Sequence, residues 1–426
     1  DLKGVKIRVP QLRVWVDFWT LLGAAPTPLP YSEQYSALST GICRVSNCLR
    51  SEDTLLTAEA LRTMGVMIHD DGHIFTIDGC HGRLKPATKE IYLANSGTSM
   101  RLLTGISALG QGTYILTGTP RMQERPIQDL LDGLAQIGVA SRSVNQTGCP
   151  PIEIIGGQVR GGHMDMDCSI SSQFLSSVLL MAPLTEQGID VAIVKDLVSK
   201  PYVDMTVDIM ERLGVEVGRD GYARFSVKGG QSYCPGDYAV EPDCSQASYF
   251  WGAAAITGKR IKVKNISRNS RQGDVKFADV LEKMGCRVFH ENDGIAVQGG
   301  NLKAVSVDMS VMPDVVPTLA VVASFAEGTT EITNVAHLKE KECDRLGCVA
   351  TELIRMGVDA RATDSGLLIT GGSNHHGAEI ETYDDHRMAM CFAIAGLRVP
   401  GVMIRNEGCV KKSFPNYWDV FEGLYA

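Results

Sequence analysis

LEKMGCRV, residues 281–288, joins the end of a helix-like run to the start of a strand-like run through Gly285. Glycine directly after a helix suits the left-handed conformation that caps a helix C-terminus. The same phrase occurs four more times, as LRTMGVMI (61–68), LAQIGVAS (134–141), MERLGVEV (210–217) and LIRMGVDA (353–360). The five glycines recur about every 70 residues, a period longer than that of common solenoids, so each repeat is predicted to be a small αβ module.

Two further landmarks keep the same register. A short strand runs into glycine after each phrase, as in FSVKGG (225–230) and IAVQGG (295–300). An apolar helix followed by a strand occurs six times, as in AAITGKRIKVKN (254–265). Because three landmarks agree in register, we predict six units, each with two helices and three or four strands.

The helices of these units are of two kinds. Those that end in glycine are amphipathic, whereas the others are apolar on all sides and are expected to be buried. The apolar runs are TSMRLLTGISAL (98–109), SQFLSSVLLMAPL (172–184), SQASYFWGAAAITG (245–258), PTLAVVASFAEG (317–328) and HRMAMCFAIAGL (386–397). This pairing predicts an α/β fold in which buried helices lie inside a shell of sheets, with three units in each of two domains.

The composition argues against several classes of protein. A net charge of −8 over 426 residues is unfavourable for a general nucleic-acid binder. No run of about 18 apolar residues occurs, so we expect no membrane span. The twelve cysteines are scattered without a C-x-x-C spacing, which predicts reduced thiols in a cytoplasmic protein.

Charged and hydroxylated residues recur at the starts of the helices. Basic residues precede the amphipathic helices, namely Arg50, Arg125, Lys200, Arg271, Lys341 with Arg345, and Lys412. Small hydroxylated or acidic residues begin the buried helices, namely Ser96-Gly97-Thr98, Ser171-Ser172-Gln173, Asp243 with Ser245, Asp314, and Asp385-His386-Arg387. Capping explains any one of these starts. Because helix N-termini bind anions, their repetition beside basic residues predicts a cleft for a compound with several phosphates or carboxylates.

The densest group of charges is HLKEKECDRLG, residues 337–347. On a solvated helical face, Lys341 and Arg345 would stand four residues apart, as would Glu340 and Asp344. Both pairs carry like charges and are unfavourable on an exposed helix. We therefore interpret this segment as a cluster that binds a ligand and is suited to acid–base chemistry beside an anion.

Nine motifs carry a resemblance to one family. They are NSGTSMR (95–101), PRMQERPI (120–127), SISSQFLSS (169–177), SKPYVDMT (199–206), EPDCSQASYF (241–250), MPDVVPTLAVVA (312–323), KEKECDRL (339–346), YDDHRMAM (383–390) and KKSFPNYW (411–418). In order and over nearly the whole chain outside residues 11–36, the sequence resembles the 5-enolpyruvylshikimate-3-phosphate synthases. The resemblance implies an inside-out α/β barrel architecture of two domains. The first would span residues 11–240, and the second residues 241–426, completed by residues 1–10.

The resemblance also implies an activity. The enolpyruvyl group of phosphoenolpyruvate would pass to the 5-hydroxyl of shikimate 3-phosphate, with release of phosphate, by addition and then elimination. Phosphoenolpyruvate would be bound by Gly97, Arg125, Gln173, Arg345, Arg387 and Lys412. Shikimate 3-phosphate would be bound by Ser171, Ser172, Gln173, Ser199, Tyr202, Asp314, Lys341 and His337, the last standing where the family usually has Asn. Asp314 would take the proton from the 5-hydroxyl, and Glu342, with His386 or Lys412 beside it, would handle the proton at the methylene carbon.

No metal or organic cofactor is expected, and the partners would be the two small substrates, with no nucleic acid and no membrane. We expect a cytoplasmic monomer.

Two alternative functions stay open. UDP-N-acetylglucosamine enolpyruvyl transferase shares the fold, but its reactive cysteine stands on the loop that corresponds to residues 113–125, where this chain has none. The other alternative is a relative that keeps the fold and binds anions with impaired catalysis.

Residues 11–36 depart from the family pattern. The family has Lys-Ser at the start of its first buried helix and an Arg four residues after the Ser, and this stretch contains no lysine. Pro26, Pro28 and Pro30 would break a helix there. Three interpretations are open. The stretch could be a divergent substitute in which Arg13 and Ser32 replace the missing residues, or it could belong to a remodelled or inactive relative that keeps the fold. The third interpretation, which we favour, is an error in the sequence. If the stretch is literal, we expect very weak activity, because a clamp cation is missing.

A smaller departure lies at the start of the 98–109 helix. The family often has Ala where Ser96 stands and Pro where Leu102 stands. We expect a slightly shifted helix start at Gly97 and reduced sensitivity to glyphosate, the inhibitor that occupies the phosphoenolpyruvate site of the family. Simple repacking around these two side chains is the alternative.

Overall fold

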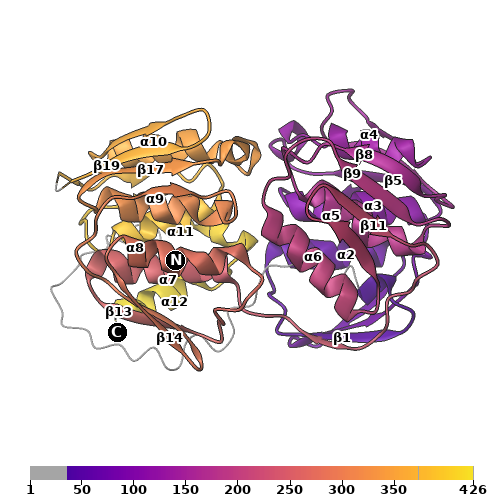
Figure 1. Cartoon of the computed structure of the whole chain (residues 1–426), viewed down its shortest axis with the longest axis horizontal. Coiled ribbons are helices and arrows are strands. Elements are labelled where there is room, and N and C mark those ends of the chain that lie inside the picture. Colours follow the sequence, from indigo (N-terminus) through magenta and orange to yellow (C-terminus); the bar gives the residue numbers. More distant parts are fainter. Residues whose placement is uncertain (1–35, 373, 426) are drawn as a thin grey trace. The chain divides into compact units, whose positions relative to one another are not determined.

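The glycine after each amphipathic helix adopts the left-handed conformation that the sequence predicts. The structure is a computed structural model that describes residues 36–372 and 374–425 (Figure 1). Positive φ angles between 83° and 106° occur at Gly65, Gly138, Gly214, Gly285 and Gly357. After each glycine the next amide donates to the carbonyl five residues back, as from Val66 to Leu61 at 3.0 Å and from Cys286 to Leu281 at 3.0 Å. This is the Schellman motif, which turns the chain sharply from a helix into a strand.

The two kinds of helix are present as predicted. The amphipathic helices are α2 (Glu52–Thr63), α4 (Gln128–Gln136), α6 (Lys200–Arg212), α8 (Phe277–Lys283), α10 (Arg345–Arg355) and α12 (Tyr417–Glu422). The buried helices are α3 (Gly97–Leu109), α5 (Gln173–Met181), α7 (Cys244–Thr257), α9 (Val316–Ser324) and α11 (His386–Ala395). Every residue of α9 and α11 is buried, so these helices form the interior.

Buried helices connect parallel neighbours in the sheets. Thus α3 joins β4 (Ile91–Tyr92) to β5 (Gly112–Thr117), and α5 joins β8 (Gly162–Met166) to β9 (Ile189–Ile193). Likewise α9 joins β16 (Ser306–Asp308) to β17 (Gly328–Thr333), and α11 joins β20 (Glu379–Ile380) to β21 (Met403–Ile404). The two strands that follow each of α2, α4, α6, α8 and α10 pair with one another in antiparallel fashion. In these four repeats the N-terminus of the buried helix therefore follows the first strand of its parallel pair.

The described residues divide into two compact units, one ending at Val240 and the other starting at Glu241. The first unit holds three four-stranded sheets. Their orders are β12 (Asp237–Ala239), β1 (Ile42–Ser46), β3 (Ile74–Asp78), β2 (Met67–Asp70); β4 (Ile91–Tyr92), β5 (Gly112–Thr117), β7 (Ile152–Gly156), β6 (Ala140–Ser143); and β8 (Gly162–Met166), β9 (Ile189–Ile193), β11 (Arg224–Val227), β10 (Val217–Asp220). Since β12 pairs in parallel with β1, the end of this unit returns to its first sheet.

The second unit repeats the plan, but two of its three sheets have fewer than four strands. Their orders are β13 (Arg260–Lys264), β15 (Gly294–Gln298), β14 (Arg287–Glu291); β16 (Ser306–Asp308), β17 (Gly328–Thr333), β19 (Leu367–Gly371), β18 (Asp359–Ala362); and β20 (Glu379–Ile380), β21 (Met403–Ile404). The prediction of three or four strands in every unit is therefore wrong for the last repeat, which has two. Its chain continues into 3-10 turns and α12 instead of a hairpin.

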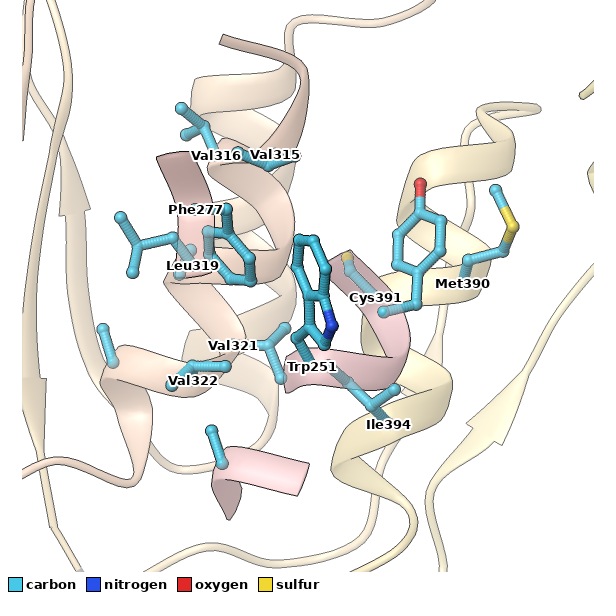
Figure 2. Packing of buried hydrophobic residues seen from close by; sticks show 14 of the residues in the cluster. Trp251, Phe277, Val315, Val316, Leu319, Val321, Val322, Met390, Cys391 and Ile394 are labelled. Carbon is cyan, nitrogen blue, oxygen red and sulfur yellow. The ribbon is translucent and has the colours of Figure 1, made fainter. Parts of the chain in front are cut away.

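The core of the second unit is built from its three buried helices, α7, α9 and α11, which lie side by side between the sheets (Figure 1). Trp251 of α7 is fully buried, and its indole N–H donates to the Ile295 carbonyl at 3.2 Å. Figure 2 shows this ring between α9, which carries Leu319, and α11, which carries Cys391 and Ile394. A second apolar core fills the first unit. The predicted fold class, α/β with buried helices inside sheets, is confirmed.

Two expectations fall on residues outside the described part of the chain. They are the completion of the second domain by residues 1–10 and the interpretation of residues 11–36, of which only Ser36 is described.

Candidate active site

In the second unit, charged side chains from three helix starts meet. Asp314 lies in a 3-10 turn, η4 (Pro313–Val315), directly before α9. Arg345 is the first residue of α10, and Asp385 caps α11 by accepting from the Arg387 amide at 2.9 Å. With Glu342 and Arg387, these residues form what we call the carboxylate–guanidinium cluster: Asp314, Glu342, Arg345, Asp385 and Arg387.

Arg345 is the centre of this cluster. Its guanidinium donates from Nε to Asp385 Oδ2 at 2.7 Å, from Nη2 to Glu342 Oε2 at 2.7 Å and from Nη1 to Asp314 Oδ1 at 3.1 Å. The Arg345 side chain is 2% exposed and that of Asp385 is 0% exposed. A cation buried this deeply requires several anionic partners to offset its lost hydration, and three carboxylates supply them.

Three further cations surround the carboxylates. Arg387 Nη2 donates to Asp314 Oδ2 at 3.0 Å, so Asp314 bridges two guanidinium groups. Lys341 Nζ lies 3.8 Å from Asp314 Oδ1, and Lys412 Nζ lies 3.5 Å from Glu342 Oε1. Lys412 ends the 3-10 helix η6 (Glu407–Lys412) and is buried. Four cations and three carboxylates thus share one largely buried location.

The cations control the charge state of the carboxylates. Burial by itself raises the pKa of Asp314, but Arg387, Lys341 and Arg345 outweigh that effect and hold its pKa well below the usual range. Burial likewise opposes ionisation of Asp385, and Arg345 reverses this, so the pKa of Asp385 is lowered. Both side chains are therefore carboxylates at neutral pH.

Two histidines lie among these charges in neutral form. Burial lowers the pKa of His386 to about 3, and the neighbouring cations Arg387 and Lys412 act in the same direction. Its Nδ1 is buried and lies 3.6 Å from Asp385 Oδ1, beyond hydrogen-bond distance. His337, in η5 (Ala336–Glu340), is buried too, and burial together with Lys341 lowers its pKa to about 4. At neutral pH neither imidazole is in its protonated, cationic form, so neither can act as an imidazolium acid.

In the first unit, a second basic group lies at the start of α3. Arg125 is 3% exposed and donates from Nη1 to the Asn95 carbonyl at 3.0 Å and to Asn95 Oδ1 at 3.2 Å. Gly97, the first residue of α3, leaves room for this side chain, because a Cβ there would stand 2.5 Å from Arg125 Nη2 and 2.8 Å from Arg101 Nη1. Two guanidinium groups therefore lie against the backbone of one helix N-terminus.

Gln173 connects the starts of α3 and α5. It accepts from Arg101 Nη1 at 3.0 Å and donates to Thr98 Oγ1 at 2.7 Å, while its amide N–H donates to Ser171 Oγ at 3.3 Å. The predicted residues Gly97, Arg125, Ser171 and Gln173 are thus close together in the structure.

The remaining predicted residues of the first unit also lie at helix starts. Ser172 is buried and precedes α5, and no side-chain capping bond is formed there. Ser199 precedes α6 with a left-handed φ of 52°, and its carbonyl accepts from the Tyr202 amide at 3.1 Å. The helices α5 and α6 are tied by Ser176 and Thr206, whose hydroxyl oxygens are 2.8 Å apart. Small polar groups are therefore presented at adjacent helix N-termini.

The sequence points to most of these residues but not to two of them. Arg101 stands out only as part of a motif, and Asp385 only as a helix start. The position of Asp385 at the N-cap of a helix could have indicated its role in the cluster. One oxygen of a capping carboxylate accepts from the helix amide, and the second oxygen can accept from a guanidinium. The expectation that residues 337–347 do not form a solvated helix is confirmed, since η5 ends at Glu340 and α10 begins at the buried Arg345.

Other features of the described residues bear on possible ligands. No three His, Cys, Asp or Glu side chains in residues 36–372 and 374–425 are grouped as a metal ion would require. In that same part of the chain no helix combines the length and the apolar character that a membrane span needs. All twelve cysteines are free thiols.

The sequence is similar to two protein families over different lengths. The sequence model of the EPSP synthase (3-phosphoshikimate 1-carboxyvinyltransferase) family matches residues 35–421. Residues 1–43 match the sequence model of the bacterial extracellular solute-binding proteins of family 7. The stretch 11–36, which departs from the synthase pattern, therefore lies almost entirely outside the synthase match.

Whole-chain relatives agree with the longer match. A 3-phosphoshikimate 1-carboxyvinyltransferase of Sulfurovum sp. (strain NBC37-1) is 43% identical over 393 residues, which cover 91% of this chain and 92% of the relative. One of Enterobacter sp. (strain 638) is 44% identical over 388 residues, covering 90% and 91%. The structure of EPSP synthase from Acinetobacter baumannii has a TM-score of 0.78 and 30% identity and covers 94% of each chain. These matches do not favour the UDP-N-acetylglucosamine enzyme or a non-catalytic relative. The chain therefore belongs to the EPSP synthase (3-phosphoshikimate 1-carboxyvinyltransferase) family.

Proposed function

We propose that this protein transfers the enolpyruvyl group of phosphoenolpyruvate to the 5-hydroxyl of shikimate 3-phosphate and releases phosphate, as a step of aromatic amino acid biosynthesis. One observation carries the proposal. Asp314 and Glu342, the two predicted proton-handling carboxylates, contact the same guanidinium, that of Arg345. A reaction that moves two protons beside a multiply charged anion needs this combination of bases and cations.

The cations of the second unit are proposed to bind phosphoenolpyruvate. Arg345, Arg387 and Lys412 supply donors for its carboxylate and phosphate, and guanidinium groups bind such oxygens in pairs. Burial strengthens these contacts, because little water competes for the same donors. Lys341 and His337 would contact shikimate 3-phosphate.

Asp314 is proposed to become the base only when substrate is bound. The effect of burial on its pKa is outweighed by Arg387, Lys341 and Arg345, which hold the pKa well below the usual range. A carboxylate so stabilised is a weak base. When phosphoenolpyruvate takes up the charge of Arg345 and Arg387, that stabilisation falls and the pKa of Asp314 rises. Substrate binding would thus activate the group that removes the 5-hydroxyl proton.

Proton transfer at the methylene carbon of phosphoenolpyruvate is assigned to Glu342, the carboxylate that lies beside Lys412. During addition, the 5-oxygen bonds to C2 of phosphoenolpyruvate while a proton joins C3. During elimination, a proton leaves C3 as the C–O bond to phosphate breaks. Glu342, with Lys412 Nζ 3.5 Å from Oε1, is proposed to carry this proton. The neutral His386 would contribute by its position rather than as a cationic acid, because its pKa is lowered to about 3, chiefly by burial.

The residues of the first unit are proposed to complete substrate binding. Arg125 and Gln173 would contact phosphoenolpyruvate, with Gly97 allowing it close to the backbone. Shikimate 3-phosphate would be bound by Ser171, Ser172, Gln173, Ser199 and Tyr202. These groups stand at the N-termini of α3, α5 and α6, where free amides favour anions.

We further propose that the protein acts as a cytoplasmic monomer without a cofactor and that glyphosate competes with phosphoenolpyruvate. Residues 11–240 and 241–426 would be its two domains, with residues 1–10 completing the second. The unit boundary at Val240 and Glu241 supports this division.

The test is phosphate release by protein whose intact mass matches this sequence. Release should require both shikimate 3-phosphate and phosphoenolpyruvate, and Asp314→Asn should lower kcat by about a hundredfold or more. Asp359→Asn, an exposed change on β18, is the matched control and should leave the rate unchanged. Absence of both phosphate release and shikimate 3-phosphate binding would overturn the proposed function.

A further inference from the structure

Glu352 is a buried carboxylate that the reaction described above does not use. It lies on α10, two turns after Arg345, and its side chain is 0% exposed. A buried carboxylate is strongly unfavourable unless hydrogen bonds or cations replace its water. Its partners therefore indicate what the side chain does.

The partners of Glu352 lie on the segment that leads into α11. Oε1 accepts from the Tyr383 hydroxyl at 2.7 Å, and Oε2 accepts from the Glu381 amide at 3.1 Å. Burial and the Glu352 carboxylate together raise the pKa of Tyr383, so the phenol remains a donor at neutral pH. Arg355 Nη1, on the same helix, adds a contact to Oε2 at 3.3 Å.

The segment held by Glu352 has an unfavourable backbone. Tyr383 and Asp384 are consecutive non-glycine residues with φ angles of 52° and 56°. Side chains with a Cβ rarely adopt this left-handed conformation, and it persists only where surrounding contacts impose it. The Tyr383 side chain and the Glu381 amide are anchored on Glu352, at the position where such contacts are needed.

The same helix also holds the far end of the segment. Asp385 follows Asp384 directly and accepts from Arg345 at 2.7 Å, so α10 contacts residues 381–385 at Glu352 and again at Arg345. Asp385 in turn caps α11 and fixes the backbone of Arg387. If the turn at 383–384 relaxed, Asp385 and Arg387 would leave the carboxylate–guanidinium cluster together.

We propose that Glu352 is a positioning residue that holds residues 381–385 in the left-handed turn and thereby places Asp385 and Arg387 for binding of phosphoenolpyruvate. The part of this inference that concerns catalysis rests on the function proposed above. Glu352 does not touch the reacting atoms and acts through the backbone of the turn.

Glu352→Gln is a sharp test because both carboxylate oxygens accept from donors. In an amide of the same shape, an NH₂ group that faces the Glu381 N–H opposes another donor, whereas an NH₂ group that faces Tyr383 requires the phenol to become the acceptor. In either orientation the charged acceptor shared by both contacts is lost. Glu379→Gln is the matched control. It makes the same chemical change two residues before Glu381 and removes only the exposed ion pair with Arg405.

Two measurements separate positioning from general stability. Hydrogen exchange should speed up by about tenfold or more for the amides of residues 382–387 in Glu352→Gln, while exchange in α9 stays unchanged. In steady-state kinetics, KM for phosphoenolpyruvate should rise about tenfold or more, with the dissociation constant of shikimate 3-phosphate within about twofold of the parent. Glu379→Gln should change neither quantity.

A double variant checks the specific contact. Tyr383→Phe removes the hydroxyl at Oε1, and this is a contact that Glu352→Gln already weakens. The double variant should therefore exchange no faster than Glu352→Gln alone, a non-additive result that a general loss of stability would not produce.

The outcomes are distinct. Unchanged exchange at residues 382–387, or faster exchange spread evenly over the second unit with an unchanged KM, would overturn the proposal. A parent protein with neither phosphate release nor binding of shikimate 3-phosphate would overturn the proposed function instead, and the exchange measurements would still decide whether Glu352 holds the turn.

Discussion

Arg345 and Asp385 form a buried ion pair in which Nε donates to Oδ2 at 2.7 Å, and Asp385 also accepts from the Arg387 amide at 2.9 Å. One carboxylate thereby joins the first residue of α10 to the first turn of α11. Because Arg345 also contacts Asp314, which precedes α9, three helix starts are held in one arrangement by the protein's own side chains. Preorganised donors of this kind lower the reorganisation needed when negative charge develops in a reaction.

Arg345→Met should unfold far more easily than the parent. The change keeps much of the side-chain volume but leaves Asp314, Glu342 and Asp385 without their shared cation. Removing one partner from a buried ionic group costs about 3–5 kcal/mol of unfolding free energy. Urea denaturation at pH 7.5 measures this loss. Arg361→Met on the exposed face of β18 should change the unfolding free energy by less than about 0.5 kcal/mol. A comparably small effect of Arg345→Met would contradict the prediction.

The unfolding free energy should fall as the pH drops below about 6.5, the ordinary pKa of histidine. Burial lowers the pKa of His386 to about 3 and that of His337 to about 4 in the folded protein. Between these values and 6.5 the unfolded chain therefore binds protons that the folded chain does not, so acid favours unfolding. Each histidine contributes a slope of about 1.4 kcal/mol per pH unit.

Urea midpoints at several pH values from 5 to 7.5 check that slope. His337→Asn and His386→Gln should each flatten the curve, because an amide does not titrate. Above pH 7.5 the slopes of parent and variants should agree. Parallel curves at all pH values would show that these two side chains are not buried as neutral imidazoles.

Gly97→Ala should weaken binding of phosphoenolpyruvate. The added Cβ would stand 2.5 Å from Arg125 Nη2 and 2.8 Å from Arg101 Nη1, so at least one guanidinium must move. A displaced binding group should raise KM for phosphoenolpyruvate about tenfold to a hundredfold. Gly157→Ala is the control, because a Cβ at that position meets nothing within 4 Å. Equal KM values for the parent and Gly97→Ala would refute the role of Gly97.

Replacing residues 11–36 with a segment that carries the Lys-Ser start and the following Arg of the family pattern should raise kcat by about a hundredfold to a thousandfold, since one charged donor in a binding site for developing charge has roughly this effect. The expectation follows from the absence of lysine in this stretch. The control is the same replacement with its lysine changed to Ala, which should stay slow. If the parent is already as fast, Arg13 or Ser32 would supply the missing contact.

Ser96→Ala should make the protein more sensitive to glyphosate. Ser96 caps α3, and its hydroxyl lies 2.7 Å from that of Ser99, which lies 2.6 Å from Thr57 Oγ1. This buried chain of hydroxyl groups ties the helix start beside Gly97 to α2. Loss of the cap should also lower the unfolding free energy by about 1 kcal/mol. Inhibition constants that are the same in the parent, Ser96→Ala and Leu102→Pro would count against the idea.

Much of the fold was predictable because its signals are local. A glycine such as Gly285 can adopt positive φ without a steric penalty, so the end of α8 is encoded in a few adjacent residues. The all-round apolar composition of α9 likewise predicts burial wherever the helix packs. The shortened last sheet was not predictable in this way, because β20 and β21 are too short to show a period.

The helix starts that carry charge can be identified from the residues alone, since Asp314, Arg345 and Arg387 all lie in motifs. Which of these charges share a partner depends on the packing of the folded chain. Arg345 meets Asp314 across 31 residues and Asp385 across 40, and Arg101 meets Gln173 across 72. Such pairing depends on distance through space, which follows from how the buried helices pack. For the same reason the neutral state of His386 and the depressed pKa of Asp314 follow from burial and neighbouring charge, not from residue type.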